Sequence, residues 1–583
     1  MAAWGLTMTN RPFSVAPRTS VVPPAAVAEI SQLFQRGSLD LVLAKSAVLA
    51  RQFPATASIW FILGAVALRL GRVQKATNYW RRQRLLAPSD AENYLNLADV
   101  AKTEGKLAAA ELGYRRVITL TPLHALALDA LALCLEKAGR NNVAQCFHIR
   151  ALAANPNLAS AYNNLALLYQ NTGQHYNALR LFKHALVTTQ IVEAYKNRAG
   201  ALIKVGQAAA AVNHCRRALM LAPDDGEGHF NHGTALKAAG QLAPAVVQFD
   251  RALVINPTYA EASWNKALAL LKSGNFQEGW QLYEARWRLT SRQRPWPNLP
   301  KPLWQRGAPG RLLIWAEQGV GEALIFSSMI TELHSQCDHL IVSVDARLIP
   351  LLSRSAPPGV VFHPSNVEVD PATYDKHLPM GHLCQLLRAN LTQIRAAPSP
   401  FLEADSTRTT AIRAQLGNGQ APIFGLSWRS GSLTRLNKSI DPARLVSILP
   451  SDNTVLVNLQ YGDTREEIAA VKAATGREII DLPEIDNFND IDGLAATVSA
   501  CDHIITIANV TADLAGGLAK DVCVLLGPDT DWRWLADGKT TPWYPSARLY
   551  RQTGYLDWSP VLTALTADLI VRDDPPSEHR GGG

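Results

Sequence analysis

Glycine recurs at a nearly constant interval through the first half of this 583-residue chain. The glycines stand at positions 37, 71, 105, 139, 173, 206, 240 and 274, so that successive steps are 34, 34, 34, 34, 33, 34 and 34 residues. Prolines 54, 88, 122 and 156 keep the same step, Gln190 interrupts it, and prolines 223 and 257 resume it. A fixed period of this length is typical of stacked structural repeats, in which each repeat packs against its neighbours.

Each period also has a fixed internal order. A small residue follows the glycine by five positions, at Ala76, Ala110, Ala144, Ala178, Ala211 and Ala245, and a bulkier residue generally comes four later, at Trp80, Tyr114, His148, Phe182, Cys215 and Phe249. Glycine permits the turn between two helices, alanine allows their close approach, and proline ends the second helix. This is the tetratricopeptide pattern, and it predicts an α-solenoid of eight repeats over residues 23–290, after a disordered leader at 1–22. We expect His148, Cys215 and the aromatic residues to be packing residues.

Asparagines recur shortly after the aromatic position of the first helix. They are Asn96, Asn163, Asn164, Asn197, Asn231 and Asn265. A solenoid of this kind offers a concave surface to an extended peptide, and groove-facing amides can hydrogen-bond a peptide backbone. Two roles remain open for these residues: contact with a protein acceptor, or plain solvation.

The solenoid is expected to stop at a junction over residues 291–309. Prolines 295, 297, 300 and 302 lie within eight residues and forbid a helix there. The sequence around the junction contains more tryptophans than a flexible tether needs: Trp280, Trp287, Trp296 and Trp304. We therefore predict that they fix the last repeat against the next domain.

Beyond the junction, short β-rich runs alternate with helical segments, which is typical of parallel sheets. Strands are predicted near 340–344, 360–363, 422–429, 455–460, 478–481, 503–507 and 522–526, and a helix over 381–394. Two such series predict two doubly wound lobes, at 310–405 and 406–575, followed by a disordered tail at 576–583. A ligand is expected in the cleft at the carboxyl ends of their strands.

One stretch stands out at the start of the first lobe. A buried strand over 312–316 is followed by Gly319 and Gly321, and a helical pattern begins at Glu322. Such a turn can bring backbone N–H groups up to a phosphate or a sugar. It is not a dinucleotide fingerprint, because Leu324 replaces the third glycine, and no Gly-Lys-Ser/Thr follows that would make a Walker loop.

Composition excludes several classes. A net charge of +8 on a chain this long, without a block of like charges, does not indicate a nucleic-acid partner. Seven scattered cysteines without a Cys-x-x-Cys pair indicate reduced thiols, a cytoplasmic location and no zinc site. We expect no membrane span and no export signal. No metal is expected either, since the Asp529-Thr-Asp531 motif follows the final predicted strand, and Trp532, Trp534 and Trp543 are interpreted as packing at the lobe interface.

Several stretches of the second half resemble one family in order. They are 317–326, 346–355, 425–429, 457–463, 514–517, 531–534, 542–545 and 548–552. They are similar to bacterial fusions of tetratricopeptide repeats with a glycosyltransferase, whose C-terminal halves resemble heptosyltransferases and whose plan resembles flagellin glycosyltransferases and protein O-GlcNAc transferases. The resemblance implies a GT-B fold and inverting, metal-independent transfer from a nucleotide sugar, with no cofactor.

The resemblance also implies site residues. Glu322 falls where the family usually has Asp, the suspected base for the acceptor hydroxyl, and a carboxylate suits that role. Arg429, Arg435 and Lys438 would neutralise the leaving diphosphate. The remaining donor-binding residues implied are Gly319, Gly321, Ser427, Gln460, Tyr461, Asn509, Val510, Thr511 and Asp513.

The chain departs from its relatives at three places. Ala508 replaces an Asp, Asp513 replaces a His on the phosphate side, and Gly-Asp-Glu becomes Gly321-Glu-Ala323. These changes predict either an altered donor or a lobe that no longer catalyses. The leading hypothesis is a cytoplasmic protein O-glycosyltransferase that recruits a protein, with flagellin favoured, through its repeats. The rival is a non-catalytic adaptor, and transfer to lipopolysaccharide is a weaker third reading.

Overall fold

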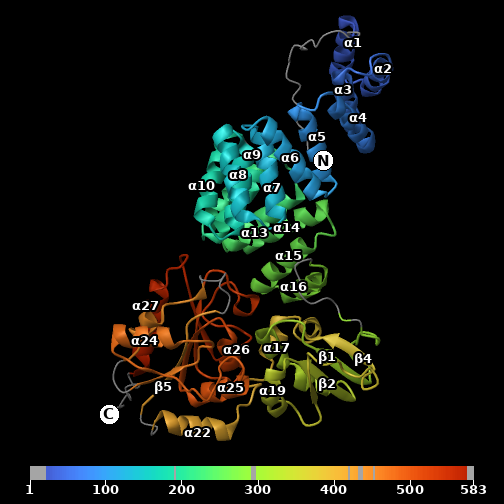
Figure 1. Ribbon diagram of the computed structural model, residues 1–583. Coiled ribbons are helices and arrows are strands. Elements are labelled where there is room, and N and C mark those ends of the chain that lie inside the picture. The colour runs from blue at the N-terminus through green and yellow to red at the C-terminus, as the bar shows by residue number, and fades with distance from the viewer. Residues whose placement is uncertain are drawn as a thin grey trace, which may run out of the picture. The chain divides into compact units, whose positions relative to one another are not determined.

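The computed structural model describes residues 22–189, 192–289, 297, 299–417, 421–430, 438–450 and 454–573. The chain forms two compact units, residues 1–205 and 206–583, whose elements are labelled in Figure 1. Arg435 and Trp296, both singled out above, lie outside the described residues.

The first unit is built of helix pairs. Its helices are α1 (Pro24–Gln35), α2 (Leu39–Gln52), α3 (Ala57–Arg69), α4 (Val73–Leu86), α5 (Ala91–Thr103), α6 (Leu107–Leu120), α7 (Ala125–Lys137), α8 (Asn141–Ala154), α9 (Ala159–Asn171), α10 (His175–Thr188) and α11 (Val192–Lys204). The second unit opens with α12 (Ala208–Leu221), α13 (Gly226–Ala238), α14 (Leu242–Ile255), α15 (Ala260–Lys272), α16 (Phe276–Leu282) and the 3₁₀ helix η1 (Tyr283–Arg288). The border between the units falls inside the sixth predicted repeat.

The periodic glycines form the turns between paired helices that their spacing predicts. Each stands between the two helices of a pair with φ between 72° and 86°, a left-handed conformation that side chains with a Cβ rarely adopt. The periodic alanines and the bulky residues four positions later are all buried, with His148 and Cys215 fully inaccessible. The helical solenoid and the packing role of these positions are therefore confirmed.

The first lobe contains a four-stranded parallel sheet. Its strands are β1 (Arg311–Trp315), β2 (His339–Val344), β3 (Val361–Pro364) and β4 (Lys376–Pro379), in the order β3-β2-β1-β4. The helices around it are α17 (Val320–Ser327), α18 (Ile330–His334), η2 (Ala346–Leu348), α19 (Ile349–Ser355), η3 (Met380–His382), α20 (Leu383–Leu387) and α21 (Leu391–Arg395). The single helix expected over 381–394 is wrong, because Arg388 (φ −138°) leaves the helical region and Asn390 caps a new helix.

The second lobe contains a six-stranded parallel sheet of order β10-β9-β8-β5-β6-β7. Its strands are β5 (Ile423–Ser427), β6 (Val455–Asn458), β7 (Ile479–Ile480), β8 (His503–Ile507), β9 (Val522–Leu526) and β10 (Ala547–Arg551). The helices are α22 (Ser406–Leu416), α23 (Pro442–Val446), α24 (Arg465–Thr475), α25 (Ile491–Ala500), α26 (Val510–Gly517), η5 (Trp532–Trp534) and α27 (Ser559–Asp573). Two parallel sheets after the solenoid confirm the predicted α/β class; assignment to the GT-B fold itself stays a prediction.

Trp280 of the last repeat packs against tryptophans of the second lobe, as predicted for the junction. The ring centroid of Trp280 lies 5.0 Å from that of Trp532 and 6.3 Å from that of Trp543, both in edge-to-face geometry. All three side chains are buried, and the Trp280 indole N–H donates to the backbone carbonyl of Arg388 at 3.1 Å. The last repeat is thus fixed to the second lobe by buried aromatic contacts and to the first lobe by this hydrogen bond.

Candidate functional site

Each sheet has a point where the direction of strand order reverses. In the first lobe the chain runs from β1 through β2 to β3 and then returns to place β4 on the other side of β1. In the second lobe it runs from β5 to β7 and returns to place β8 on the other side of β5. Ligands of open α/β sheets bind outside the carboxyl ends of the strands at such switch points.

The two switch points are joined by a pair of helices. Helix α17 follows β1, and helix α26 follows β8. These two helices pack against each other between the sheets, which Figure 1 shows in yellow-green and red-orange. The carboxyl ends of β1 and β8 therefore open toward one shared region, which is the candidate site.

The buried side chain of Arg533 lies at the centre of this region and contacts several carboxylates. Nη2 of Arg533 donates to Oε1 of Glu322 on α17 at 2.7 Å, and Nη1 donates to Oδ1 of Asp513 on α26 at 3.0 Å. Nη2 also lies 3.3 Å from Oδ2 of Asp531, and the hydroxyl of Tyr544 donates to Oδ1 of Asp513 at 2.9 Å. Arg533 thus ties the first lobe to the second through carboxylates on both sides.

The carboxylates around Arg533 differ in how much of each side chain is exposed to solvent. The Asp513 side chain is 6% exposed, whereas that of Glu322 is 25% exposed. One Glu322 oxygen is held by Arg533, and the other, Oε2, has no hydrogen-bond partner among the described residues. An incoming hydroxyl can therefore reach Glu322 but not Asp513; the third carboxylate, Asp531, is 35% exposed.

Burial dominates the ionisation of Asp513. It raises the pKa of this carboxyl to about 6, although Arg533 and the Tyr544 hydroxyl act to lower it. Burial alone would lower the pKa of Arg533, but the carboxylates of Asp513, Asp531 and Glu322 outweigh it and raise that pKa. The acidic residue at position 513 is thus paired with a cation.

The two glycines before and within α17 are required for space. A Cβ on Gly319 would lie 2.9 Å from Glu322 Oε2, and a Cβ on Gly321 would lie 2.6 Å from Asp513 Oδ2. Neither glycine has a positive φ. The small size of Gly321, rather than conformational freedom, lets α17 approach α26, and that of Gly319 leaves room for the Glu322 carboxylate. Contact of these glycines with a donor stays a prediction.

Three of the predicted donor residues form one hydrogen-bonded group at the second switch point. Ser427 ends β5, Gln460 follows β6, and Asn509 caps α26 with its side chain. Nδ2 of Asn509 donates to Oγ of Ser427 at 2.8 Å, and that hydroxyl donates to Oε1 of Gln460 at 3.1 Å. Gln460 Oε1 also accepts the backbone N–H groups of Trp428 and Arg429, at 3.0 and 2.8 Å.

The other predicted donor residues surround this group. Arg429 pairs with Glu467 at 3.0 Å, Tyr461 lies 6.1 Å from the Phe488 ring, and Lys438 and Val510 are half-buried. The Oγ1 of Thr511 is buried without a hydrogen-bond partner. The structure thus brings together residues of β5, β6 and α26 that are up to 84 positions apart in sequence, from 427 to 511.

Sequence reasoning missed two groups. Arg533 and Tyr544 lie in motifs that the resemblance used, but neither residue had been assigned a role. The second group lies at the first switch point, where Arg286 of η1 contacts Glu284 at 2.7 Å, His382 at 2.9 Å and Glu317 at 3.2 Å. No spacing in the sequence signals either group, because the partners come from distant elements.

The asparagines of the solenoid occupy different settings. Nδ2 of Asn197 donates to Oδ1 of Asn163 in the preceding repeat at 3.0 Å, whereas Asn164 donates to Asp129 at 3.0 Å. Asn96 is 8% exposed. In the second unit Asn231 is half-buried, and Asn265 accepts from Lys237. Contact with a peptide stays a prediction for all six.

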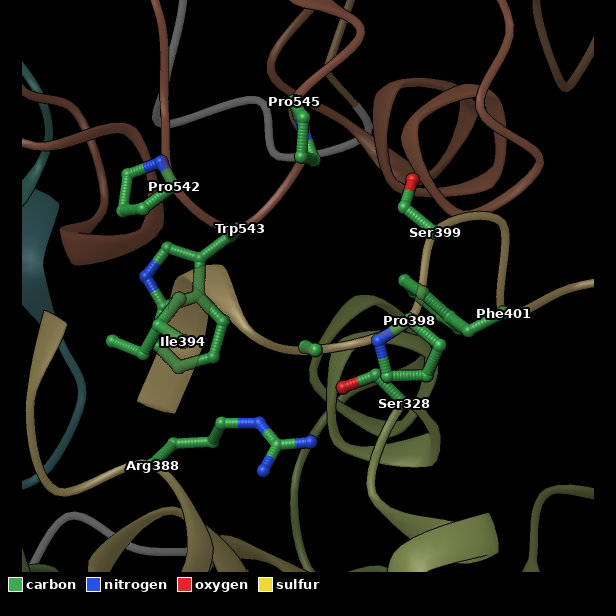
Figure 2. A pocket seen from close by; sticks show the side chains of 10 residues that line it. Ser328, Arg388, Ile394, Pro398, Ser399, Phe401, Pro542, Trp543 and Pro545 are labelled. Atoms are coloured by element: carbon green, nitrogen blue, oxygen red, sulfur yellow. The ribbon is translucent and has the colours of Figure 1, made fainter. Parts of the chain in front are cut away.

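A small cavity is lined by residues of both lobes. Figure 2 shows it between Ile394, Pro398 and Phe401 of the first lobe's end and Trp543 and Pro545 of the second lobe. Its volume is about 10 Å³. A cavity of this size holds at most about one water molecule and cannot receive a sugar.

Two further observations concern the described part of the chain. It contains no group of three or more His, Cys, Asp or Glu side chains placed to hold a metal ion. None of its helices is both long and apolar enough to cross a lipid bilayer.

The helix pairs and the two parallel sheets define a tetratricopeptide-like solenoid followed by a two-lobed α/β region. Residues 159–186 match the tetratricopeptide repeat family model. Among curated proteins, the chain is 31% identical over 321 residues to Protein FlbA of Caulobacter vibrioides, with 51% of this chain and 53% of that protein covered. The chain thus spans about half the length of the curated relative it matches.

Solved structures resemble parts of the chain. A tetratricopeptide repeat protein from Parabacteroides merdae is 17% identical, with 42% of this chain and 98% of that chain covered and a TM-score of 0.36. A thermophilic TPR protein of Thermus thermophilus is 23% identical, with 31% and 100% covered and a TM-score of 0.27.

Proposed function

We propose that this protein is an inverting, metal-independent glycosyltransferase that moves a sugar from a nucleotide-sugar donor to Ser or Thr of a protein bound by its repeats. The observation that carries the proposal is the position of Glu322. Its carboxylate stands where two switch-point helices meet, is partly exposed, and keeps one oxygen without a hydrogen-bond partner among the described residues. A carboxylate so placed suits a general base for an acceptor hydroxyl.

The chemistry assigns each neighbour a role. Glu322 Oε2 takes the proton of the acceptor hydroxyl as its oxygen attacks the anomeric carbon, and the nucleoside diphosphate leaves from the opposite face of the sugar. Charge then develops on the diphosphate. The N-terminal amides of α26, together with Arg429 and Lys438, stabilise that charge. Arg533 fixes Glu322 by holding its other oxygen.

The acceptor is proposed to be a protein, with flagellin as the candidate that the family resemblance favours. The helical solenoid supports this part of the proposal, because stacked repeats of this kind bind extended peptides. We further propose a cytoplasmic location. All seven cysteines are unpaired in the structure, which fits a reducing compartment.

A second function is favoured by one specific observation. Three carboxylates surround Arg533, so the central region carries more negative than positive charge when all are ionised. Such a centre repels a diphosphate and would suit an adaptor that has kept the fold and lost the chemistry. In the adaptor, Arg533 and its partners would serve only to hold the lobes together.

Mass spectrometry of an acceptor separates these two functions. The purified protein is mixed with flagellin and a panel of nucleotide sugars, and an increase in acceptor mass by one sugar is expected with one donor. Glu322→Gln should lower the rate by at least about 100-fold, because general base catalysis contributes that much. Glu368→Gln, which changes an exposed carboxylate of the same lobe, should leave the rate unchanged.

Calorimetry with the same donors completes the test. If Glu322→Gln still binds the donor while transfer is lost, the assignment of Glu322 as base is supported. If no donor binds to the wild-type protein and no acceptor gains mass, the adaptor function replaces the proposal.

A further inference from the structure

Positive charge is concentrated on the second helix of each repeat in the first unit. The second helices α2, α4, α6, α8 and α10 contain eleven Lys and Arg residues but only two acidic residues. The first helices α1, α3, α5, α7, α9 and α11 contain six residues of each sign. All eleven basic side chains are exposed: Lys45, Arg51, Lys75, Arg81, Arg82, Arg84, Arg115, Arg116, Arg150, Arg180 and Lys183.

The second helices form the outer layer of the solenoid. Each first helix packs on the second helix of its own repeat, and first helices of neighbouring repeats pack on one another, α7 on α9 and α9 on α11. Ion pairs join neighbouring second helices: Arg72, just before α4, contacts Asp40 of α2 at 3.0 Å, and Arg140, just before α8, contacts Glu111 of α6. The basic residues thus lie on the side away from the first helices, which carry the candidate groove asparagines.

Most of these positive charges have no acidic partner. Lys45 pairs with Glu29, and Arg115 pairs with Glu111 at 2.9 Å. The other nine have no carboxylate oxygen within 4.0 Å in the part of the chain that the structure describes. The two acids of the second helices, Asp40 and Glu111, are themselves paired with arginines. This side of the first unit therefore attracts anions.

Large aliphatic side chains stand beside the basic ones. Leu85 of α4 is 72% exposed, Leu112 of α6 is 71% exposed, and Val187 of α10 is 80% exposed. Residues three or four positions apart are neighbours on a helix surface. Leu85 follows Arg81 by four positions, Val187 follows Lys183 by four, and Leu112 precedes an arginine by three. Exposed apolar and basic groups are therefore adjacent on three of the five second helices. We call these three aliphatic residues and the eleven basic residues the outer face.

This combination favours one kind of anionic partner. Basic side chains attract anionic lipid headgroups, and aliphatic side chains beside them can enter the boundary of the acyl region. A nucleic acid would use the charges through its phosphates but would gain nothing from the aliphatic groups. An acidic protein would need carboxylates in one fixed arrangement, whereas a fluid lipid surface can place headgroups under basic residues spread over five helices.

We propose that the outer face binds the anionic surface of a lipid bilayer. The association is peripheral: headgroups pair with the ammonium and guanidinium groups, and Leu85, Leu112 and Val187 reach the edge of the acyl region. The first helices stay accessible to a peptide in this arrangement. The proposal does not depend on sugar transfer, so a protein without transferase activity would bind the bilayer as well.

Sedimentation with large unilamellar vesicles tests the proposal on the full-length protein. Vesicles of phosphatidylcholine alone are compared with vesicles in which phosphatidylglycerol makes up about a third of the lipid. The protein should bind the anionic vesicles at least about 10-fold more tightly, since each basic residue near such a surface adds to the affinity. The difference should shrink at high salt, because salt screens exposed charges.

Two variants examine the two components of the outer face. Arg81→Gln/Arg82→Gln/Arg84→Gln should lower the affinity for anionic vesicles by at least about 10-fold. Leu85→Ser/Val187→Ser should lower it by about 3-fold or more, because two aliphatic side chains no longer enter the acyl boundary.

The matched control removes the same charge from another layer of the same unit. Arg69, Lys137 and Lys204 are exposed and end the first helices α3, α7 and α11. Arg69→Gln/Lys137→Gln/Lys204→Gln should bind anionic vesicles nearly as well as the wild type. Thermal unfolding verifies that all variants are folded.

Several results would overturn the proposal. Equal binding to neutral and anionic vesicles would exclude recognition of anionic lipid, and equal losses in the two triple variants would show an effect of net charge alone. Full vesicle affinity of Leu85→Ser/Val187→Ser, together with equally tight binding of duplex DNA, would assign the outer face to nucleic acid. A folded wild type that binds no vesicles would leave the outer face to an acidic protein.

Discussion

Asp513 shows that the charge of a residue can be read from the sequence while its partners cannot. From the sequence, an acidic side chain in place of histidine adds negative charge where a diphosphate is expected. In the structure this carboxylate points to Arg533 and Tyr544 and is almost fully buried. The position of Asp513 could be identified from the sequence, but its partner comes from η5, 20 residues further on.

The raised pKa of Asp513 predicts a specific dependence of stability on pH. The folded state holds this proton up to about pH 6, whereas the unfolded chain releases it near 3.8. Between these values the folded state binds more protons, so the contribution of Asp513 to stability falls as pH rises and stays low above about pH 6. The shift corresponds to about 3 kcal/mol.

Asp513→Asn removes this titration, so the comparison isolates it. Relative to the wild type, the variant should gain stability between pH 4 and pH 7, by up to about 3 kcal/mol. Thermal unfolding of both proteins across this range measures the difference. A difference that stays constant with pH, or a wild type that gains on the variant as pH rises, would show that Arg533 rather than burial sets the pKa.

Elements with strong periodicity could be predicted, and elements held by tertiary contacts could not. Strands β8 and β9 lie where they were predicted, since each is a short run rich in β-branched or other apolar residues. Strand β10 reads Ala-Arg-Leu-Tyr-Arg, lies at the edge of its sheet, and was not predicted. The same limit applies to the site: Glu322 could be placed from its motif, but its partner Arg533 depends on how α17 meets α26.

The packing of α17 on α26 predicts a steric effect. Gly321→Ala places a Cβ 2.6 Å from Asp513 Oδ2, which cannot move aside because Arg533 and Tyr544 both hold this carboxylate. The expected cost is about 1–3 kcal/mol, together with a loss of transfer activity as Glu322 is displaced. Thermal unfolding and the acceptor-mass assay measure the two effects.

Gly200→Ala is the matched control for that variant. Gly200 lies inside α11, and a Cβ there would meet only Gln170 Nε2, at 3.7 Å. Alanine is favoured over glycine in a helix by about 1 kcal/mol, so this variant should be neutral or more stable. If Gly321→Ala behaved in the same way, close approach of the two helices would not be what requires the glycine.

At the scale of the whole molecule, the solenoid contributes directly to the first switch point. Arg286 belongs to η1, the last turn after the repeats, yet it is fully buried and contacts Glu317 at the end of β1 and His382 after β4. Glu317 also accepts the backbone N–H of Gly381 at 3.2 Å. The contact between the last repeat and the first lobe therefore involves more than aromatic packing. The buried Arg286 side chain connects the last repeat to the loop that leads into Gly319 and Glu322.

Arg286→Met should consequently affect both stability and activity. It leaves Glu317, whose side chain is 1% exposed, without its cation, and breaking a buried pair in this way costs about 3–5 kcal/mol. Arg288→Met changes an exposed arginine two residues away and should change neither property. Thermal unfolding measures the first effect, and the acceptor-mass assay at a temperature where the variant is folded measures the second. Full activity of folded Arg286→Met would show that the junction holds the lobes without positioning Glu322, because the loop would then keep its geometry with Glu317 unpaired.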